Sequence, residues 1–166
     1  MSDLDRCRSE EEALSAIPLL VQGVIETVQK ESIRFYRRVH SHDMGSYRAV
    51  RDEFFFLLLA VVRWRIEDLL SGEQASPAIA LLRKEMSNAL AGVDRAFDPE
   101  RFWNTWDDRC QEYRYVLLPE QKAEPDLVAD ALAPCFGRHL TGHLDEQAVK
   151  VMHFSAHSLR DLLRAT

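Results

Sequence analysis

Four histidines near the end of the chain have the residue type and the spacing to bind a metal ion. They form two HxxxH pairs, His139 with His143 and His153 with His157. Residues four apart lie on one face of a helix, about one turn from each other. Two imidazoles in this arrangement are a common way to hold zinc, or a redox metal at an open site. One hypothesis is therefore a zinc or other divalent-metal site built from these four histidines.

The same histidines also fit an ordinary surface position. Thr141-Gly142 is expected to interrupt the helix, so the two pairs need not share a face. His153 and His157 align with charged residues rather than with leucines. The aligned residues are Glu146, Lys150, Arg160 and Arg164. The sequence leaves a metal site and partly solvated surface histidines as alternatives, together with a role in pH sensing or phosphotransfer.

The segment HFSAHSLRDLLR, His153 to Arg164, resembles part of the DinB-type helical bundles, which hold a metal ion with three histidines. In that family the first histidine comes from an earlier helix. The long central helix of this chain contains no histidine, so the resemblance implies that His40 or His42 reaches in from a loop. The stretch from His157 to Asp161 also resembles part of the phosphorylated segment of histidine phosphotransfer domains, except that Asp161 replaces a glycine.

Other catalytic motifs are missing from the sequence. GxGxxG, GxxxxGK(S/T) and GxSxG do not occur, so phosphate-binding loops and the usual serine nucleophile are not supported. The helical di-iron signature, ExxH, is absent too. Glu53 and Glu67 lie in an apolar helix, where carboxylates can act as ligands or acid–base groups. More often such carboxylates pair with arginines, here Arg51, Arg63 or Arg65.

The charge balance argues against several kinds of partner. The chain has 27 acidic and 21 basic residues and a net charge of −6, opposite to the basic surface that nucleic-acid backbones require. The longest apolar run, Phe54 to Val62, is about half as long as the roughly 20 residues of a membrane span. The first residues are too charged for a secretion signal, and 3 cysteines without CxxC spacing fit a reducing compartment. We therefore expect a cytoplasmic protein without nucleic-acid or membrane partners.

Helix-breaking residues predict where the helices lie. Only 6 glycines and 6 prolines occur among 166 residues, which favours long helices. Pro18 is expected to kink the first helix or to divide it. Glycines are expected at three helix ends, namely Gly72, Gly92 and Gly137, and prolines at three helix starts, namely Pro77, Pro99 and Pro125. About six helices follow from this pattern, over residues 9–40, 46–72, 77–92, 99–118, 125–136 and 144–164.

Apolar residues at helical spacing predict the core. The run FFFLLLAVV is apolar on every face, so its helix should run through the centre of a bundle or be covered in a dimer. Trp103 and Trp106 are interpreted as core residues rather than as the lining of a ligand pocket. A further apolar stripe is formed by Phe102, Trp106, Cys110, Tyr113 and Leu117.

These patterns predict an all-α fold with a single domain over residues 1–166. We expect a bundle of about six helices with a long antiparallel N-terminal hairpin, about 18–40 and 46–71, and a buried central helix. The function predicted first is that of a small, acidic, non-enzymatic interaction protein of the accessory, chaperone-like or toxin-neutralising type. It would need no cofactor and would dock a protein partner or further copies of itself through an apolar helix face or an acidic surface. The alternative is a metal-binding helical bundle, including a metal-dependent hydrolase, that uses the C-terminal HxxxH pairs and a zinc-bound water.

Overall fold

A computed structural model describes residues 10–39, 46–70, 72–116 and 125–141 of the chain. These ranges contain helices and their connections and no strand, which confirms the all-α class for the part described. The helices are α1 (Glu10–Val39), α2 (Tyr47–Leu69), α3 (Gly72–Val93), α4 (Pro99–Val116) and α5 (Pro125–Thr141). The helix expected over residues 144–164 lies outside the described residues. None of the described helices is long and apolar enough to cross a bilayer.

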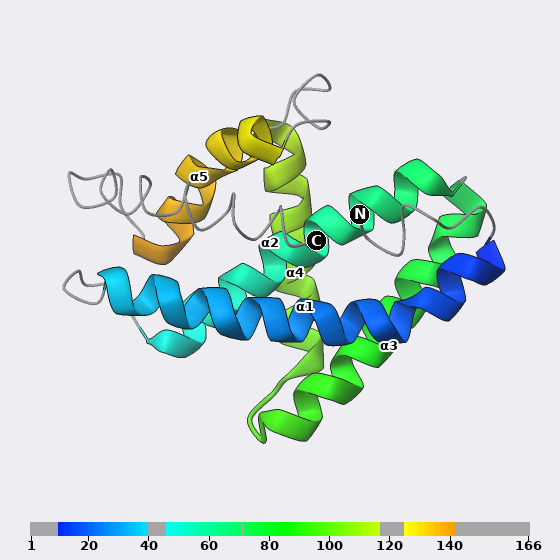
Figure 1. The fold of residues 1–166 in the computed structure, drawn as a ribbon, viewed down its shortest axis with the longest axis horizontal. Helices are drawn as coiled ribbons and strands as arrows, with labels where there is room; N and C mark the ends of the chain where they lie inside the picture. Colours follow the sequence, from blue (N-terminus) through cyan, green and yellow to red (C-terminus); the bar gives the residue numbers. More distant parts are fainter. Residues whose placement is uncertain (1–9, 40–45, 71, 117–124, 142–166) are drawn as a thin grey trace.

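Helix α2 is the centre of the bundle, as its apolar run predicts. It packs against α1, α3, α4 and α5, and α1 and α2 run in opposite directions in Figure 1, as expected for the N-terminal hairpin. Every side chain from Glu53 to Ala60 is buried. Because the helices of this one chain cover the run, its apolar character does not require a dimer interface.

Two glycine-based helix ends are predicted wrongly. Helix α2 ends at Leu69, with the Leu70 N–H bonded to the Ile66 carbonyl at 2.9 Å, and Gly72 begins α3 instead of ending α2. Gly137 lies inside α5, which continues to Thr141. An interior glycine costs a helix only about 1 kcal/mol, and burial of Leu140 beyond Gly137 favours one more helical turn by a larger amount.

Three prolines lie inside the described helices, namely Pro18, Pro77 and Pro134. Helix α1 continues through Pro18, so of the two alternatives, a kink or a division, the division is wrong. The axis of α1 bends within its N-terminal half (Figure 1). Pro77 lies within α3 rather than at its start. Proline has no N–H, so the helical hydrogen bond from residue 77 to the Glu73 carbonyl is lost. This bond belongs to the N-terminal end of α3, and Ala75 and Ala78 are buried on either side of the proline.

Helix α4 confirms the predicted cap and core stripe. Asp98 precedes Pro99, and its Oδ1 accepts the Arg101 backbone N–H at 3.2 Å. The two tryptophans are core residues, as interpreted from the sequence. Their rings meet edge to face at 5.1 Å, and the Trp103 Nε1–H donates to Ser87 at 2.8 Å. The buried stripe comprises Phe102, Trp106, Cys110 and Tyr113, while Leu117 lies outside the described residues.

Arginines from two other helices cover the Trp106 ring. Arg63 of α2 and Arg83 of α3 lie over it, with their guanidinium carbons 5.5 and 4.8 Å from its centroid. Both arginines also pair with Asp107 of α4. Arg63 pairs with Glu67 at 2.8 Å as well, which confirms one of the carboxylate–arginine partnerships expected from the sequence. This cluster ties α2, α3 and α4 together at the edge of the core.

Glu67 should contribute stability that disappears in acid. Burial disfavours its charge, but hydrogen bonds from Arg63 and Arg114 outweigh burial, so the pKa of Glu67 lies below its usual range. Such a carboxylate stabilises the fold above its unfolded pKa of about 4.3, and the contribution is lost as the pH falls through the folded pKa. Glu67→Gln should therefore lower the free energy of unfolding at neutral pH by about 1 kcal/mol and change it much less at about pH 3.

Urea unfolding of the native chain and the variant at both pH values measures this difference. Asp68→Asn is the matched control, because Asp68 is the next residue along α2 and is exposed. A Glu67→Gln effect of equal size at the two pH values would contradict the prediction.

Candidate metal centre

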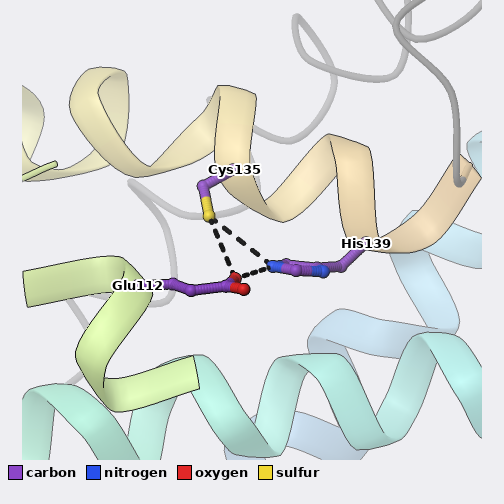
Figure 2. Close-up of side chains that lie close together, drawn as sticks. All are labelled: Glu112, Cys135 and His139. Carbon is purple, nitrogen blue, oxygen red and sulfur yellow. Dashed lines mark hydrogen bonds and ion pairs between the residues drawn. The ribbon is translucent and has the colours of Figure 1, made fainter. Parts of the chain in front are cut away.

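A thiol, an imidazole and a carboxylate converge where α4 meets α5 (Figure 2). Cys135 and His139 lie four residues apart on α5 and therefore share one face of that helix. Glu112 points toward them from α4. Within the described ranges, no other group of three such side chains lies as close together.

The distances between the three side chains are short. Cys135 Sγ lies 3.6 Å from His139 Nε2 and 3.9 Å from Glu112 Oε2. His139 Nε2 and Glu112 Oε2 are 2.5 Å apart, a hydrogen-bond contact. One ligand atom of each residue thus faces a common point between the two helices.

Apolar packing of α5 fixes the face that presents these groups. The Phe136 ring meets Phe54 of α2 edge to face at 5.0 Å and Phe35 of α1 at 6.0 Å. Because Phe136 packs on α1 and α2, the neighbouring face of α5, which includes Cys135 and His139, faces α4. The His139 ring also packs edge to face against Tyr113 at 6.3 Å, which limits its rotation.

The three side chains differ in exposure. Cys135 is 4% exposed and the His139 side chain 13%, whereas the Glu112 side chain is 42% exposed. The sulfur and the imidazole are thus held in the protein, and solvent reaches the site from the side of Glu112.

Burial makes Cys135 a poor nucleophile. It raises the pKa of the thiol, and the nearby Glu112 carboxylate acts in the same direction. The Arg138 guanidinium donates to Sγ at 3.6 Å and lowers the pKa, but not enough to reverse the shift. A reactive cysteine needs a lowered pKa, so the cluster does not resemble the site of a cysteine nucleophile.

A buried charge pair supports the α4 side of the cluster. Glu53 of α2, with a side chain 7% exposed, accepts hydrogen bonds from Arg109 Nε and from the Tyr113 hydroxyl, both at 2.8 Å. Arg109 Nη1 lies 3.8 Å from Glu112 Oε2. Sequence reasoning expected an arginine partner for Glu53, but the partner is Arg109 and not Arg51, Arg63 or Arg65.

The cluster fits zinc after a small movement of Glu112. Zinc bonds of about 2.3 Å to sulfur and about 2.0–2.2 Å to nitrogen and oxygen place tetrahedral ligand atoms roughly 3.3–3.6 Å apart. The observed separation of Cys135 Sγ and His139 Nε2, 3.6 Å, meets this requirement. The contact between His139 and Glu112 would have to open by about 0.8 Å, replacing a hydrogen bond by two metal bonds. Glu112 is long and partly exposed, so it can make this movement.

Of the four sequence-predicted ligands, His139 lies among the described residues, and it is part of the cluster. His139 faces Glu112 and Cys135, which sequence reasoning did not select. His143, His153 and His157 lie outside the described residues, as do His40 and His42. Cys135 and His139 have the same four-residue spacing as an HxxxH pair, so a search that accepted cysteine as well as histidine would have found them. Nothing in the sequence pairs Glu112 with them.

Comparison with protein-family models, curated proteins and solved structures finds no match to this chain.

Proposed function

We propose that this protein is a metal-binding helical bundle that holds zinc between Glu112, Cys135 and His139. The observation that supports the proposal is the convergence of a sulfur, a nitrogen and an oxygen ligand from two helices, with no pair of them more than 3.9 Å apart. Thiolate and imidazole are ligands that zinc accepts and that magnesium and calcium do not favour. The low exposure of Cys135 and His139 favours a defined coordination geometry over loose surface binding.

Among the described residues the site has three ligands, the number found at catalytic zinc centres. Structural zinc sites usually have four protein ligands, whereas catalytic sites have three and keep a position for water or substrate. Solvent access beside Glu112 supports the second type. Zinc lowers the pKa of its bound water to about 7, so a hydrolytic reaction is the enzymatic role that this ligand set favours.

Zinc loading tests the proposal. Untagged protein treated with a chelator, given one equivalent of zinc chloride and then desalted should retain about one zinc per chain by elemental analysis. Because zinc binds the folded state, zinc at about 100 times its Kd should raise the free energy of unfolding by about 2.7 kcal/mol. Magnesium chloride should do neither. Retention below about 0.2 equivalents of zinc would overturn the proposal.

Two hypotheses from the sequence stay predictions beside this one. The first is docking of a protein partner, or of further copies of the chain, by a non-enzymatic interaction protein. The second is participation of His143, His153 and His157 in metal binding. The zinc titration bears on the second, because replacement of these three histidines by alanine weakens zinc binding only if they supply a ligand.

A further inference from the structure

A polar pocket borders the candidate metal centre through His139. Its volume is about 500 Å³, within the range of pockets that hold small molecules. It lies at the N-terminal ends of α2 and α4, and α5 contributes His139. Its charged lining among the described residues comprises four arginines, Arg48, Arg51, Arg101 and Arg109, and three carboxylates, Asp52, Glu53 and Asp98.

Three of these arginines are already paired within the protein. Arg48 and Arg51 share Asp94, at 3.2 and 3.1 Å. Arg109 pairs with the buried Glu53 at 2.8 Å. Among the described residues, the Arg101 guanidinium has no ion-pair partner, while its backbone N–H donates to Asp98 Oδ1. The pocket thus contains a planar, permanently charged hydrogen-bond donor that is available to a ligand.

Two helix N-termini border the pocket and add partial positive charge to it. Arg48 lies in the first turn of α2, which contains no acidic residue, and Arg101 lies in the first turn of α4. A helix N-terminus carries a partial positive charge and favours anions, so a cation at this position is unfavourable unless an anion compensates it. Arg48 has its compensation in Asp94. At the start of α4, Asp98 caps the backbone and Glu100 adds an acidic residue to the first turn, but neither carboxylate pairs with the Arg101 guanidinium, which stays available to an anion in the pocket.

An aromatic wall completes the pocket. The Phe102 ring lies 5.4 Å from Phe97 and 4.8 Å from Phe56, centroid to centroid, and all three residues line the cavity. A ligand with an anionic group and a small apolar body would match both sides, because the charge meets Arg101 and the body packs on aromatic carbon.

We infer that this pocket binds a small organic oxyanion, a carboxylate or a phosphate monoester, whose charged group pairs with Arg101. The inference deepens the proposed function and, in its link to metal chemistry, rests on it. His139 belongs to both the pocket and the candidate metal centre. A small organic oxyanion bound in the pocket would therefore be the class of substrate on which a metal at that centre would act. Anion binding itself uses Arg101 and needs no metal.

Calorimetric titration of phenyl phosphate, benzoate and neutral phenol tests the inference. Each probe is titrated into chelator-treated protein and into protein loaded with one equivalent of zinc. Phenyl phosphate or benzoate should bind both forms, phenol should not, and the tighter of the two anions identifies the preferred group. Arg101→Gln should weaken anion binding at least about tenfold, since a charge-assisted hydrogen bond is lost. Zinc binding should be unchanged, because Arg101 is not among the three ligands.

Arg95→Gln is the matched control. Arg95 is also exposed and does not line the pocket. Its replacement by glutamine removes the same charge as Arg101→Gln, so this variant should bind anions as the native chain does. Circular dichroism verifies that both variants keep their helix content. Absence of binding by both anions, or equal binding by the Arg101→Gln and native chains, would overturn the inference. Anion binding to a protein that retains no zinc would support the pocket and refute the zinc proposal, so the two failures are distinguishable.

Discussion

Replacement of Cys135 by serine should weaken zinc binding by at least about 100-fold. Removing a residue that only supports a metal ligand costs about 10–100-fold in affinity, and loss of a ligand costs at least as much. A serine hydroxyl keeps its proton at neutral pH and does not replace a thiolate. Competition against a chromophoric zinc chelator measures the change. Cobalt offers a second measurement, since a thiolate ligand produces a charge-transfer absorption in the near ultraviolet that the serine variant should lack.

Cys110→Ala is the matched control for this experiment. Cys110 is also a free, buried cysteine, but it belongs to the core stripe of α4 and not to the cluster. Burial raises the pKa of Cys110 to about 12. Its replacement should leave zinc affinity and the cobalt absorption unchanged. If the Cys135→Ser and Cys110→Ala proteins bind zinc equally well, Cys135 is not a ligand.

Glu53→Gln should produce the largest loss of stability among the substitutions considered, about 3 kcal/mol in the free energy of unfolding. Removal of one partner from a buried ion pair typically costs about 3–5 kcal/mol, because the other charge stays buried without compensation. Here the stranded charge is Arg109, whose side chain is 19% exposed, and the Tyr113 hydroxyl exchanges a charged acceptor for the neutral amide oxygen of glutamine. The value lies at the low end of the range because Arg109 can turn toward Glu112.

Urea unfolding measures this loss, and the dependence on urea concentration should keep its slope because the amount of buried surface hardly changes. Asp108→Asn makes the same chemical change at an exposed position of α4 and should alter stability by no more than about 0.5 kcal/mol. A Glu53→Gln effect as small as that of the control would mean that the pair does not stabilise the fold.

The Cys135→Ser experiment examines a proposed zinc ligand, whereas the Glu53→Gln experiment examines an ion pair that supports the same region. Glu53 and Arg109 connect α2 to α4, and Arg109 lies beside Glu112. Cys135 and His139 come from α5, which is anchored separately by Phe136. Cys135→Ser should lose zinc affinity without losing stability, and Glu53→Gln should lose stability without losing zinc affinity. This pair of results would separate the ligands from the scaffold that positions them.

Local sequence patterns were enough to predict most of the described helices. The central position of α2 follows from the run FFFLLLAVV, and the buried face of α4 follows from apolar residues three and four apart. The Asp98-Pro99 cap was predicted for the same reason, since a cap depends on neighbours in the sequence. Gly72, Pro77 and Gly137 misled the prediction because each costs only a few kcal/mol at most, which burial of apolar neighbours can offset.

The candidate site was predictable only in part. His139 and Cys135 share a helix face by their spacing, which the sequence alone determines. Glu112 lies 27 residues before His139, and Arg109 lies 56 residues after Glu53. The sequence by itself therefore determined most of the described helices, the faces that they bury and the common helix face of Cys135 and His139. Only the tertiary structure decided which faces meet, because backbone hydrogen bonds fix spacing within a helix, whereas packing of Phe136, Phe54 and Phe35 fixes how α5 lies against its neighbours.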